Sequence, residues 1–345
     1  MNRTAHGVFH LAPGRVEMRE IGLRPPAPGQ ALIRGHCSAL SAGTESLIQR
    51  GEAPENLPRD SRIAGLEGGF RYPFEYGYAL VGEVIEVGAV EDEPWLGRRV
   101  FAFHPHRDHA VADLRDCRLL PDTIPEERAL FLPFVETALN LALDATPLTG
   151  ERALVCGQGV IGLLVTAVLS RFPLAELIAS DPIAMRRDHA TRLGASLAVD
   201  PGDPVDWENL HARLFAEEGD GLDFAVEVSG RLCALNQTLE LCGFGARVIL
   251  GSWYGHDRGT LDLGGHFHRR RIRLSSSQVS TLNPKWTGRW SKSRLWRLAE
   301  DWLERIQPER LITHRLPLDQ CTTAFDLAHD AGSGALQIVF DCRSS

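Results

Sequence analysis

The feature that most constrains the fold is a glycine pattern in the middle of the chain, within the stretch ALVCGQGVIGLLVTAVLSRF. Its three glycines have G-x-G-x-x-G spacing and lie between a short apolar run, as in a buried strand, and an apolar run long enough for a helix. Glycines at this spacing let the backbone approach a pyrophosphate at the helix N-terminus, where unpaired amide groups and the helix dipole favour negative charge. The stretch therefore predicts a dinucleotide-binding α/β fold. The positions predicted to bind are Gly157, Gly159, Val160, Ile161 and Gly162.

An acidic residue downstream strengthens this prediction. The run IASDP contains Asp181, and 181 minus 162 is 19 residues after the last glycine of the pattern. An acid at about that distance, at the end of the second strand, can bind the adenosine ribose hydroxyls. Its carboxylate would repel a 2′-phosphate, so the predicted cofactor is NAD. Arg186 and Arg187 keep NADP open, because an arginine there can accommodate such a phosphate.

Two later apolar runs, LDFAVEVSG and ARVILGSWYG, predict further strands of the same sheet. Small residues follow them, at Ser229 and Gly251, where a nicotinamide ring would lie beside the carboxyl ends of the strands. We therefore predict a doubly wound parallel sheet of the Rossmann type, within residues 123–275.

The chain length predicts a second domain. The chain has 345 residues, and single cores stop growing at about 250 to 300 residues. Residues 1–122 are dense in glycine and proline and carry short apolar alternations, which favours an antiparallel β domain. Residues 276–345 carry a helix with tryptophan and arginine and then a short strand, LQIVFD, which we expect to return to the first domain.

Composition excludes several classes of partner. The net charge is -8, from 37 basic and 45 acidic residues, which provides no field to attract nucleic acid or anionic lipid. A small organic substrate is therefore expected.

The sequence also bears on the compartment. A membrane span needs about 18 apolar residues in a row, and no apolar run is that long. The N-terminus lacks a signal-peptide pattern, so we expect a cytoplasmic protein. The seven cysteines include no C-x-x-C pair, which argues against a disulfide framework or a cysteine-rich zinc lobe.

The order of segments, a β-rich domain, a dinucleotide fold and a short return segment, resembles the medium-chain dehydrogenase/reductase superfamily over essentially the whole chain. GYALVGEVIEVG is similar to the G-H-E-x-x-G-x-V stretch of that superfamily, through Gly77, Gly82, Val84 and Gly88. The resemblance implies a GroES-like antiparallel β domain beside the Rossmann domain, and NAD or NADP as cofactor. It also implies a homodimer formed through the outer strand of the dinucleotide-binding sheet.

The sequence departs from the superfamily at its zinc-binding positions. Tyr78 stands where the zinc-binding histidine would be and Ala79 where a glutamate would be, while Ala42 in SAGTES replaces the cysteine of a C-G-T-D turn. Glu136 in FVETALN matches a position that often supplies the third ligand. One carboxylate cannot hold Zn²⁺, which takes three protein ligands in a catalytic site. Only Cys117 remains where the structural zinc lobe would lie, so we predict no metal.

Within the superfamily, the turn SALSAGTESLIQRGEAP and the replaced G-Y-A region resemble a zinc-free branch similar to bacteriochlorophyllide dehydrogenase. That branch oxidises a hydroxyethyl group on a chlorin ring with NAD. The chain departs from it at SSSQVSTLNPKWTGRW, where Trp286 and Trp290 suit either an aromatic substrate or a buried helix start.

Without zinc, alcohol oxidation needs a side chain as general base, typically worth about 10² to 10⁴-fold. The resemblance places the hydroxyl of Tyr78 at the former metal position, to donate to or accept from the reacting oxygen, and Thr44 at a hydroxyl relay position. Glu136 would orient Tyr78 or act as base, and His104 or His106 would connect the site to solvent. Each has a structural alternative: a ring filling the lost metal site for Tyr78, a turn cap for Thr44, a helix-dipole contact for Glu136 and plain hydrogen bonding for the histidines.

The sequence thus predicts a zinc-independent, NAD-dependent oxidoreductase that interconverts a secondary alcohol, one beside a conjugated ring in particular, and its ketone. The alternative within the same class is an NADPH-dependent enone or quinone reductase. The alternative outside it is a catalytically silent dinucleotide-binding sensor or partner protein.

Overall fold

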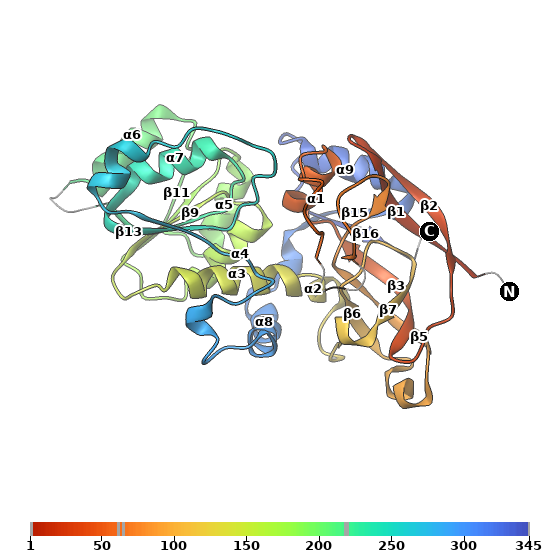
Figure 1. Cartoon of the computed structure of the whole chain (residues 1–345). Coiled ribbons are helices and arrows are strands. Elements are labelled where there is room, and N and C mark those ends of the chain that lie inside the picture. The colour runs from red at the N-terminus through yellow and green to blue at the C-terminus, as the bar shows by residue number, and fades with distance from the viewer. Residues whose placement is uncertain (1–2, 61–62, 64–65, 217–220, 344–345) are drawn as a thin grey trace. The chain divides into compact units, whose positions relative to one another are not determined.

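The computed structural model describes residues 3–60, 63, 66–216 and 221–343, and the chain divides into two compact units (Figure 1). Unit 1 comprises Met1–Leu132 and Gln307–Ser345, and unit 2 comprises Pro133–Ile306. Among the residues described, no helix has the length and apolar character needed to cross a membrane.

Unit 2 is built on a six-stranded sheet in which every pair of neighbouring strands is parallel. Its order is β11-β10-β9-β12-β13-β14, which is the doubly wound order 3-2-1-4-5-6 of the Rossmann fold. This confirms the predicted α/β class. The strands are β9 Arg152–Cys156, β10 Glu176–Ser180, β11 Leu197–Val199, β12 Leu222–Glu227, β13 Cys242–Leu250 and β14 Arg273–Ser276.

Helices lie on both faces of this sheet, with α6 and α7 on one side and α3 and α4 on the other in Figure 1. The central strands are buried on both faces, which explains why they read as continuous apolar runs instead of alternating ones. Helix α4 is buried along almost its whole length, as its unbroken apolar sequence requires. The helices are α3 Leu132–Ala145, α4 Val160–Leu169, α5 Ala184–Arg192, α6 Pro204–Leu214, α7 Leu232–Leu241 and α8 Lys292–Ile306.

Unit 1 is mainly antiparallel β structure. A seven-stranded sheet has the order β15-β16-β3-β5-β6-β8 with β7 also paired to β3, and a smaller sheet has the order β2-β1-β4. Its strands are β1 Arg3–Ala12, β2 Arg15–Leu23, β3 Gln30–Ala39, β4 Phe74–Glu75, β5 Leu80–Val87, β6 Arg99–Ala102, β7 His109–Asp113, β8 Cys117–Leu119, β15 Ile312–Pro317 and β16 Gln337–Asp341. Its helices are α1 Ala42–Gln49, α2 Glu126–Ala129 and α9 Cys321–His329.

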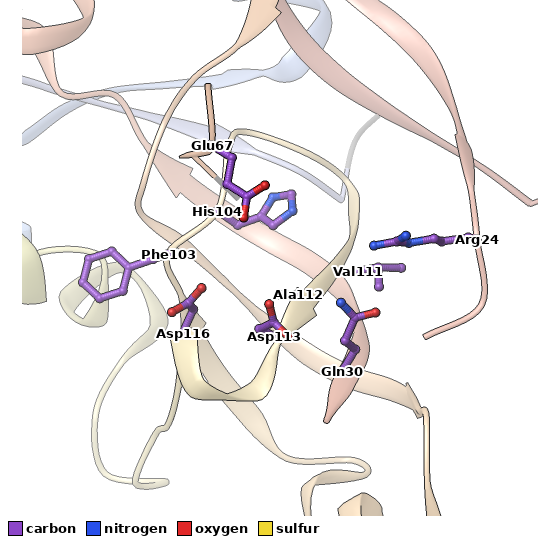
Figure 2. A pocket seen from close by; sticks show the side chains of 9 residues that line it. All are labelled: Arg24, Gln30, Glu67, Phe103, His104, Val111, Ala112, Asp113 and Asp116. Carbon is purple, nitrogen blue, oxygen red and sulfur yellow. The ribbon is translucent and has the colours of Figure 1, made fainter. Parts of the chain in front are cut away.

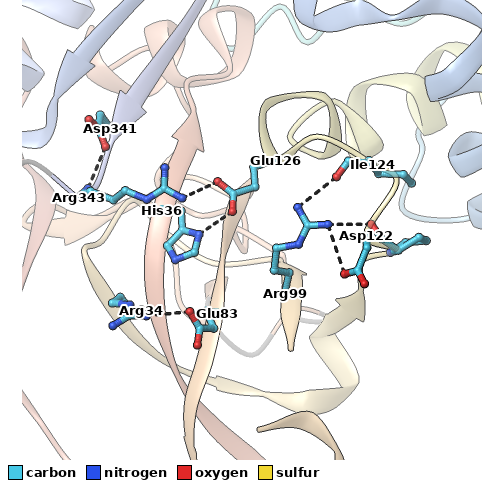
Figure 3. Close-up of polar contacts among 10 residues, drawn as sticks. Arg34, His36, Glu83, Arg99, Asp122, Ile124, Glu126, Asp341 and Arg343 are labelled. Carbon is cyan, nitrogen blue, oxygen red and sulfur yellow. Dashed lines mark hydrogen bonds and ion pairs between the residues drawn. The ribbon is translucent and has the colours of Figure 1, made fainter. Parts of the chain in front are cut away.

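The borders of the units differ from the expected ones after residues 122 and 275. Glu126 of α2 accepts hydrogen bonds from His36 of β3 at 2.8 Å and from Arg343 at 2.7 Å, which fastens α2 to unit 1 (Figure 3). At the other border, Lys292 of α8 forms an ion pair with Glu136 of α3 at 2.6 Å, so α8 stays with unit 2. The segment that returns to unit 1 therefore begins at Gln307.

Candidate active site

The glycine-rich turn of unit 2 lies at the point where the strand order reverses, between β9 and β12. Gly157 has φ = 91°, and a Cβ atom there would lie 2.6 Å from the Cα of Ser229. A Cβ at Gly162 would lie 1.9 Å from the backbone oxygen of Gly157. At Gly159 the corresponding position has no atom of the described chain within 4 Å. The first and third glycines are thus needed for the turn and its packing, and the second leaves one side open to a ligand.

The open side adjoins the start of α4. Gly159 is the N-terminal cap of α4 and brings no side chain to pair with the first amide groups, which include those of Val160 and Ile161. Below the turn, the buried Gln158 side chain donates to the carbonyl of Val155 at 2.9 Å and accepts from the Thr166 hydroxyl at 3.0 Å. The turn is therefore rigidly supported, and its amide groups suit the phosphates of a dinucleotide.

Asp181 directly follows β10 and is buried. Its carboxylate accepts from the amide of Gln158 at 2.7 Å and from the amide of Ile183 at 2.9 Å. Arg187 is engaged within the fold, since its guanidinium donates to the carbonyl of Asp181 and to Asp200. Arg186 approaches the Asp181 carboxylate at 3.8 Å. The acid therefore lies beside the glycine-rich turn, where a ribose-binding acid is expected, and Arg186 is the arginine that forms an ion pair with its carboxylate.

Ser229 and Gly251 follow β12 and β13 and are joined by a buried residue that the sequence reading missed. Glu227, fully buried at the end of β12, accepts from the Ser229 amide at 2.8 Å and from the hydroxyl of Tyr254. The Gly251 amide donates to the Glu227 carbonyl at 2.9 Å. A charged residue inside the apolar run LDFAVEVSG was the available signal, because a buried carboxylate must have partners.

In unit 1, Tyr78 lies just before β5, and its hydroxyl donates to the hydroxyl of Ser41 at 2.5 Å. It also forms a hydrogen bond with Thr44, in the first turn of α1. The side chain keeps partial exposure. Desolvation by burial nevertheless raises the pKa of the phenol well above its usual value, and the Ser41 and Thr44 hydrogen bonds only partly oppose this. Tyr78 is therefore a neutral hydrogen-bond donor at physiological pH.

Next to this tyrosine, Glu45 and His106 form a fully buried polar pair, which we call the Glu45–His106 pair. The two residues have no exposed side-chain surface, and Glu45 Oε2 lies 2.8 Å from His106 Nε2. The other carboxylate oxygen accepts from the Ser41 amide at 2.7 Å. His106 Nδ1 lies 2.6 Å from the hydroxyl of Ser38 in β3. The sequence analysis assigned no role to Glu45, Ser41 or Ser38.

Ser38, His106 and Glu45 are the residue types of a hydrolytic triad, but they are not placed as one. The Ser38 side chain is fully buried, and its hydroxyl donates to the carbonyl of Ala79 at 2.8 Å. A nucleophilic serine must reach a substrate and give its proton to the base. The cluster is therefore a support within the fold.

The remaining predicted residues lie elsewhere. His104 is buried, and its Nδ1 faces the carbonyl of Pro105 at 3.0 Å. Burial, with Arg107 and then His106 as smaller causes, lowers the pKa of His104 to about 3. It lines a pocket of about 180 Å³ with Arg24, Gln30 and Glu67 (Figure 2). Small-molecule sites usually start at about 300 Å³, so this pocket is a weak candidate for the substrate.

Glu136 belongs to α3 in unit 2, where its buried carboxylate meets Lys292. The structure thus brings Tyr78, Thr44 and the Glu45–His106 pair together within unit 1. Glu136 lies in unit 2 and forms an ion pair with Lys292. Whether Glu136 orients Tyr78 stays a prediction.

The zinc site that the superfamily resemblance implies does not fit this chain. Ala42 and Ala79 carry no donor atom, and the phenol of Tyr78 is hydrogen-bonded to Ser41. Throughout the part of the chain that the structure describes, no group of three or more His, Cys, Asp or Glu residues is arranged to hold a metal ion. Zn²⁺ in a catalytic site requires three protein ligands, so no step below is routed through a metal.

A second buried histidine adjoins the cluster and makes the fold sensitive to acid. His10 stacks on Phe74 and meets Phe325 edge to face, and neither ring nitrogen has a hydrogen-bond partner within the described residues. Burial lowers its pKa from 6.5 to about 4, with the charge of Glu45 opposing this and that of His106 adding to it. Between about pH 6.5 and pH 4, His10 is therefore protonated in the unfolded chain but neutral in the folded chain, so lowering the pH favours unfolding.

We expect the free energy of unfolding to fall by about 2 kcal/mol between pH 7 and pH 5 through His10 alone. His10→Phe removes this contribution and also two unpaired buried nitrogens, so it should be more stable than the wild type at both pH values. Urea denaturation at the two pH values tests this, with the exposed His268→Gln as control. An equal loss of stability in wild type and His10→Phe would contradict it.

No protein-family model matches the chain. Two related proteins span almost all of it. An L-threonine 3-dehydrogenase of Pyrococcus horikoshii is 24% identical over 99% of each chain. A sorbitol dehydrogenase of Pongo abelii is 26% identical over 96% of this chain and 94% of its own.

Solved structures share the fold. A protein described as a zinc-binding dehydrogenase of Sinorhizobium meliloti 1021, bound to NADP, has a TM-score of 0.78 at 19% identity, covering 98% of this chain and 99% of that one. A protein described as a short chain alcohol dehydrogenase of Escherichia coli CFT073, complexed with NADH, has a TM-score of 0.77 at 18% identity and the same coverage. In sequence and in fold the chain is thus similar to dehydrogenases of the alcohol dehydrogenase type, and it is an enzyme of that type.

Proposed function

We propose that the protein is a zinc-independent, NAD-dependent oxidoreductase that interconverts a secondary alcohol and its ketone. The observation that carries the proposal is the hydroxyl of Tyr78, which is hydrogen-bonded to Ser41 and Thr44 and which the resemblance matches to the zinc-binding histidine of the superfamily. The related L-threonine 3-dehydrogenase and sorbitol dehydrogenase support an alcohol as substrate.

The glycine-rich turn and Asp181 would hold the cofactor, whose nicotinamide supplies or accepts the hydride at the substrate carbon. In ketone reduction the carbonyl oxygen gains an electron pair, and Tyr78 gives its hydroxyl proton to that oxygen. Ser41 and Thr44 then donate hydrogen bonds to the phenolate that remains. In alcohol oxidation the phenolate takes the hydroxyl proton back. Because the pKa of Tyr78 is raised, phenolate is scarce near neutral pH, so reduction is favoured there and oxidation gains as pH rises.

NAD is proposed over NADP because the buried carboxylate of Asp181 would face a 2′-phosphate. We expect the wild type to bind NADH more tightly than NADPH, and Asp181→Ala to narrow the ratio of the two dissociation constants by about tenfold or more. Fluorescence titration with both cofactors measures the ratio. Arg186→Ala is the matched control. It removes a positive charge that would attract the 2′-phosphate, so the preference for NADH over NADPH should increase. A wild type that prefers NADPH would overturn the assignment.

The finer identity of the substrate is proposed from the sequence alone. A hydroxyl beside a conjugated ring suits a site without a Lewis acid, since such an alcohol is intrinsically more reactive, and the resemblance to the bacteriochlorophyllide dehydrogenase branch agrees with this. Trp286 and Trp290 are less suited to stack such a ring, because Arg289 and Arg294 lie over them at 5.2 and 4.1 Å. A cytoplasmic homodimer paired through β14 belongs to the same proposal.

One observation also favours an enone or quinone reductase, since a neutral phenol that donates a hydrogen bond is all that such a reaction needs at the carbonyl. The deciding experiment incubates the purified, metal-analysed protein with NADH and a panel of conjugated ketones and enones, and identifies the products. Reduction of C=O without bound zinc supports the proposal. Reduction of C=C supports the reductase, stoichiometric zinc overturns zinc independence, and no turnover with any substrate favours a silent binding protein.

A further inference from the structure

The Glu45–His106 pair has no role in the steps above, yet it is among the most enclosed polar arrangements of unit 1. Both side chains have 0% exposure. Burying two ionisable groups is costly unless each polar atom is paired. Four contacts between 2.6 and 2.8 Å offset that cost. His106 contacts the Ser38 hydroxyl, Ser38 contacts the Ala79 carbonyl, Glu45 contacts the Ser41 amide, and Glu45 contacts His106.

The hydrogen-bond directions in this cluster are fixed by counting protons. The single hydroxyl proton of Ser38 goes to the Ala79 carbonyl, so His106 Nδ1 must donate to the Ser38 oxygen. His106 Nε2 and Glu45 Oε2, 2.8 Å apart, must then share one proton between them. The pair can hold that proton on either side, and in both states it reaches the same neighbours.

Two contacts connect the pair to Tyr78. Glu45 accepts the amide proton of Ser41, whose hydroxyl receives the hydrogen bond of Tyr78. His106 packs against the backbone just before Tyr78, because a Cβ atom on Gly77 would lie 2.8 Å from its Nε2. One member of the pair therefore holds the partner of the phenol, and the other supports the loop that carries it.

We propose that Glu45 and His106 are positioning residues that act on the reaction through Tyr78 and Ser41, by the reach of their side chains and not by their charge. The inference rests on the proposed role of Tyr78. The inference predicts different effects for two substitutions of Glu45, because one changes the charge of the side chain and the other changes its length.

Glu45→Gln keeps the reach and loses the charge. Its amide oxygen can accept from Ser41, and its amide nitrogen can donate to His106 Nε2. Glu45→Asp keeps the charge and loses one methylene of reach. If position is what matters, Glu45→Gln retains kcat close to the wild type, and Glu45→Asp lowers kcat by about tenfold or more with the dissociation constant for NADH unchanged. Glu52→Gln, in the exposed pair with Arg50, serves as the control.

A double-mutant cycle tests whether the effect passes through Tyr78. In the Tyr78→Phe background, Glu45→Asp should cause no further fall in kcat, since the hydroxyl that it misplaces is already absent. A Glu45→Gln variant as impaired as Glu45→Asp would show that charge matters and overturn the inference. So would equal fractional losses in the two backgrounds.

The two proposals fail differently. If Tyr78→Phe lowers kcat but Glu45→Asp does not, only the positioning inference is wrong. If Tyr78→Phe leaves kcat unchanged, the proposed function loses its donor and the inference falls with it. Both Glu45 variants keep a polar group at the buried site, and thermal melting checks that each is folded before its activity is compared.

Discussion

Tyr78→Phe is expected to lower kcat for ketone reduction by about 10² to 10⁴-fold, the usual contribution of a positioned proton donor. The ring stays in place, so packing is preserved, while the proton that the substrate oxygen would receive is removed. The affinity for NADH should not change, because the predicted cofactor-binding residues all lie in unit 2. Steady-state kinetics with the best ketone of the panel, beside NADH titration, measures both quantities.

The chain offers a matched control for this substitution in Tyr76. It is a buried tyrosine two residues away, and its ring centroid lies 6.3 Å from that of Tyr78. Tyr76→Phe removes the same atom from the same loop and should leave kcat near the wild-type value. If the two variants lose activity equally, the effect is structural and Tyr78 is not the donor. If neither loses activity, the hydroxyl of Tyr78 has no part in the proton transfer and its ring has a structural role only.

The parallel sheet of unit 2 could be predicted from the sequence because its evidence is local. A strand, a glycine turn and a helix follow one another within the stretch that ends at Phe172, and Asp181 lies at a fixed distance beyond. Each of these signals reflects contacts between residues close in the chain. The apolar runs of the sheet likewise report burial on both faces, which needs no knowledge of the partner strand.

The support of Tyr78 could not be predicted in the same way. Glu45 and His106 are 61 residues apart, and they meet only because the antiparallel strands of unit 1 bring α1 and the loop before β7 together. Ser41 and Tyr78 are 37 residues apart. The local sequence around each of these residues does not indicate which distant residue it will contact. The resemblance to zinc enzymes singled out Tyr78, but it could not say which residues hold its hydroxyl.

The same reasoning explains the late border of unit 1. The contact that holds α2, between Glu126 and His36, spans 90 residues. The sequence around residue 122 offers only the change from β-like to helical composition, and that change is visible ten residues before the border at Leu132 (132 minus 122). Composition marks where secondary structure changes, and long-range contacts decide which unit a segment joins.

The second large effect is expected at Gly162. A methyl group there would lie 1.9 Å from the carbonyl oxygen of Gly157, and this neighbour is backbone that cannot rotate away. Gly162→Ala must therefore push α4 away from the turn, at a cost of about 3 kcal/mol or more in unfolding free energy. NADH binding should be lost with it, because the amide groups at the start of α4 no longer converge on the phosphates.

Gly159→Ala separates the two consequences. No atom of the described chain lies within 4 Å of its Cβ position, and its φ of -67° is ordinary for alanine. The fold should therefore keep its stability, while the methyl group occupies the side from which the pyrophosphate approaches. Loss of one hydrogen bond to a charged phosphate is worth about 1.5 to 3 kcal/mol, so affinity for NADH should fall about ten- to a hundredfold. Urea denaturation and NADH titration of both variants measure the contrast. If Gly159→Ala binds NADH as the wild type does, the open side of the turn is not where the dinucleotide lies, and the cofactor assignment must be sought elsewhere on unit 2.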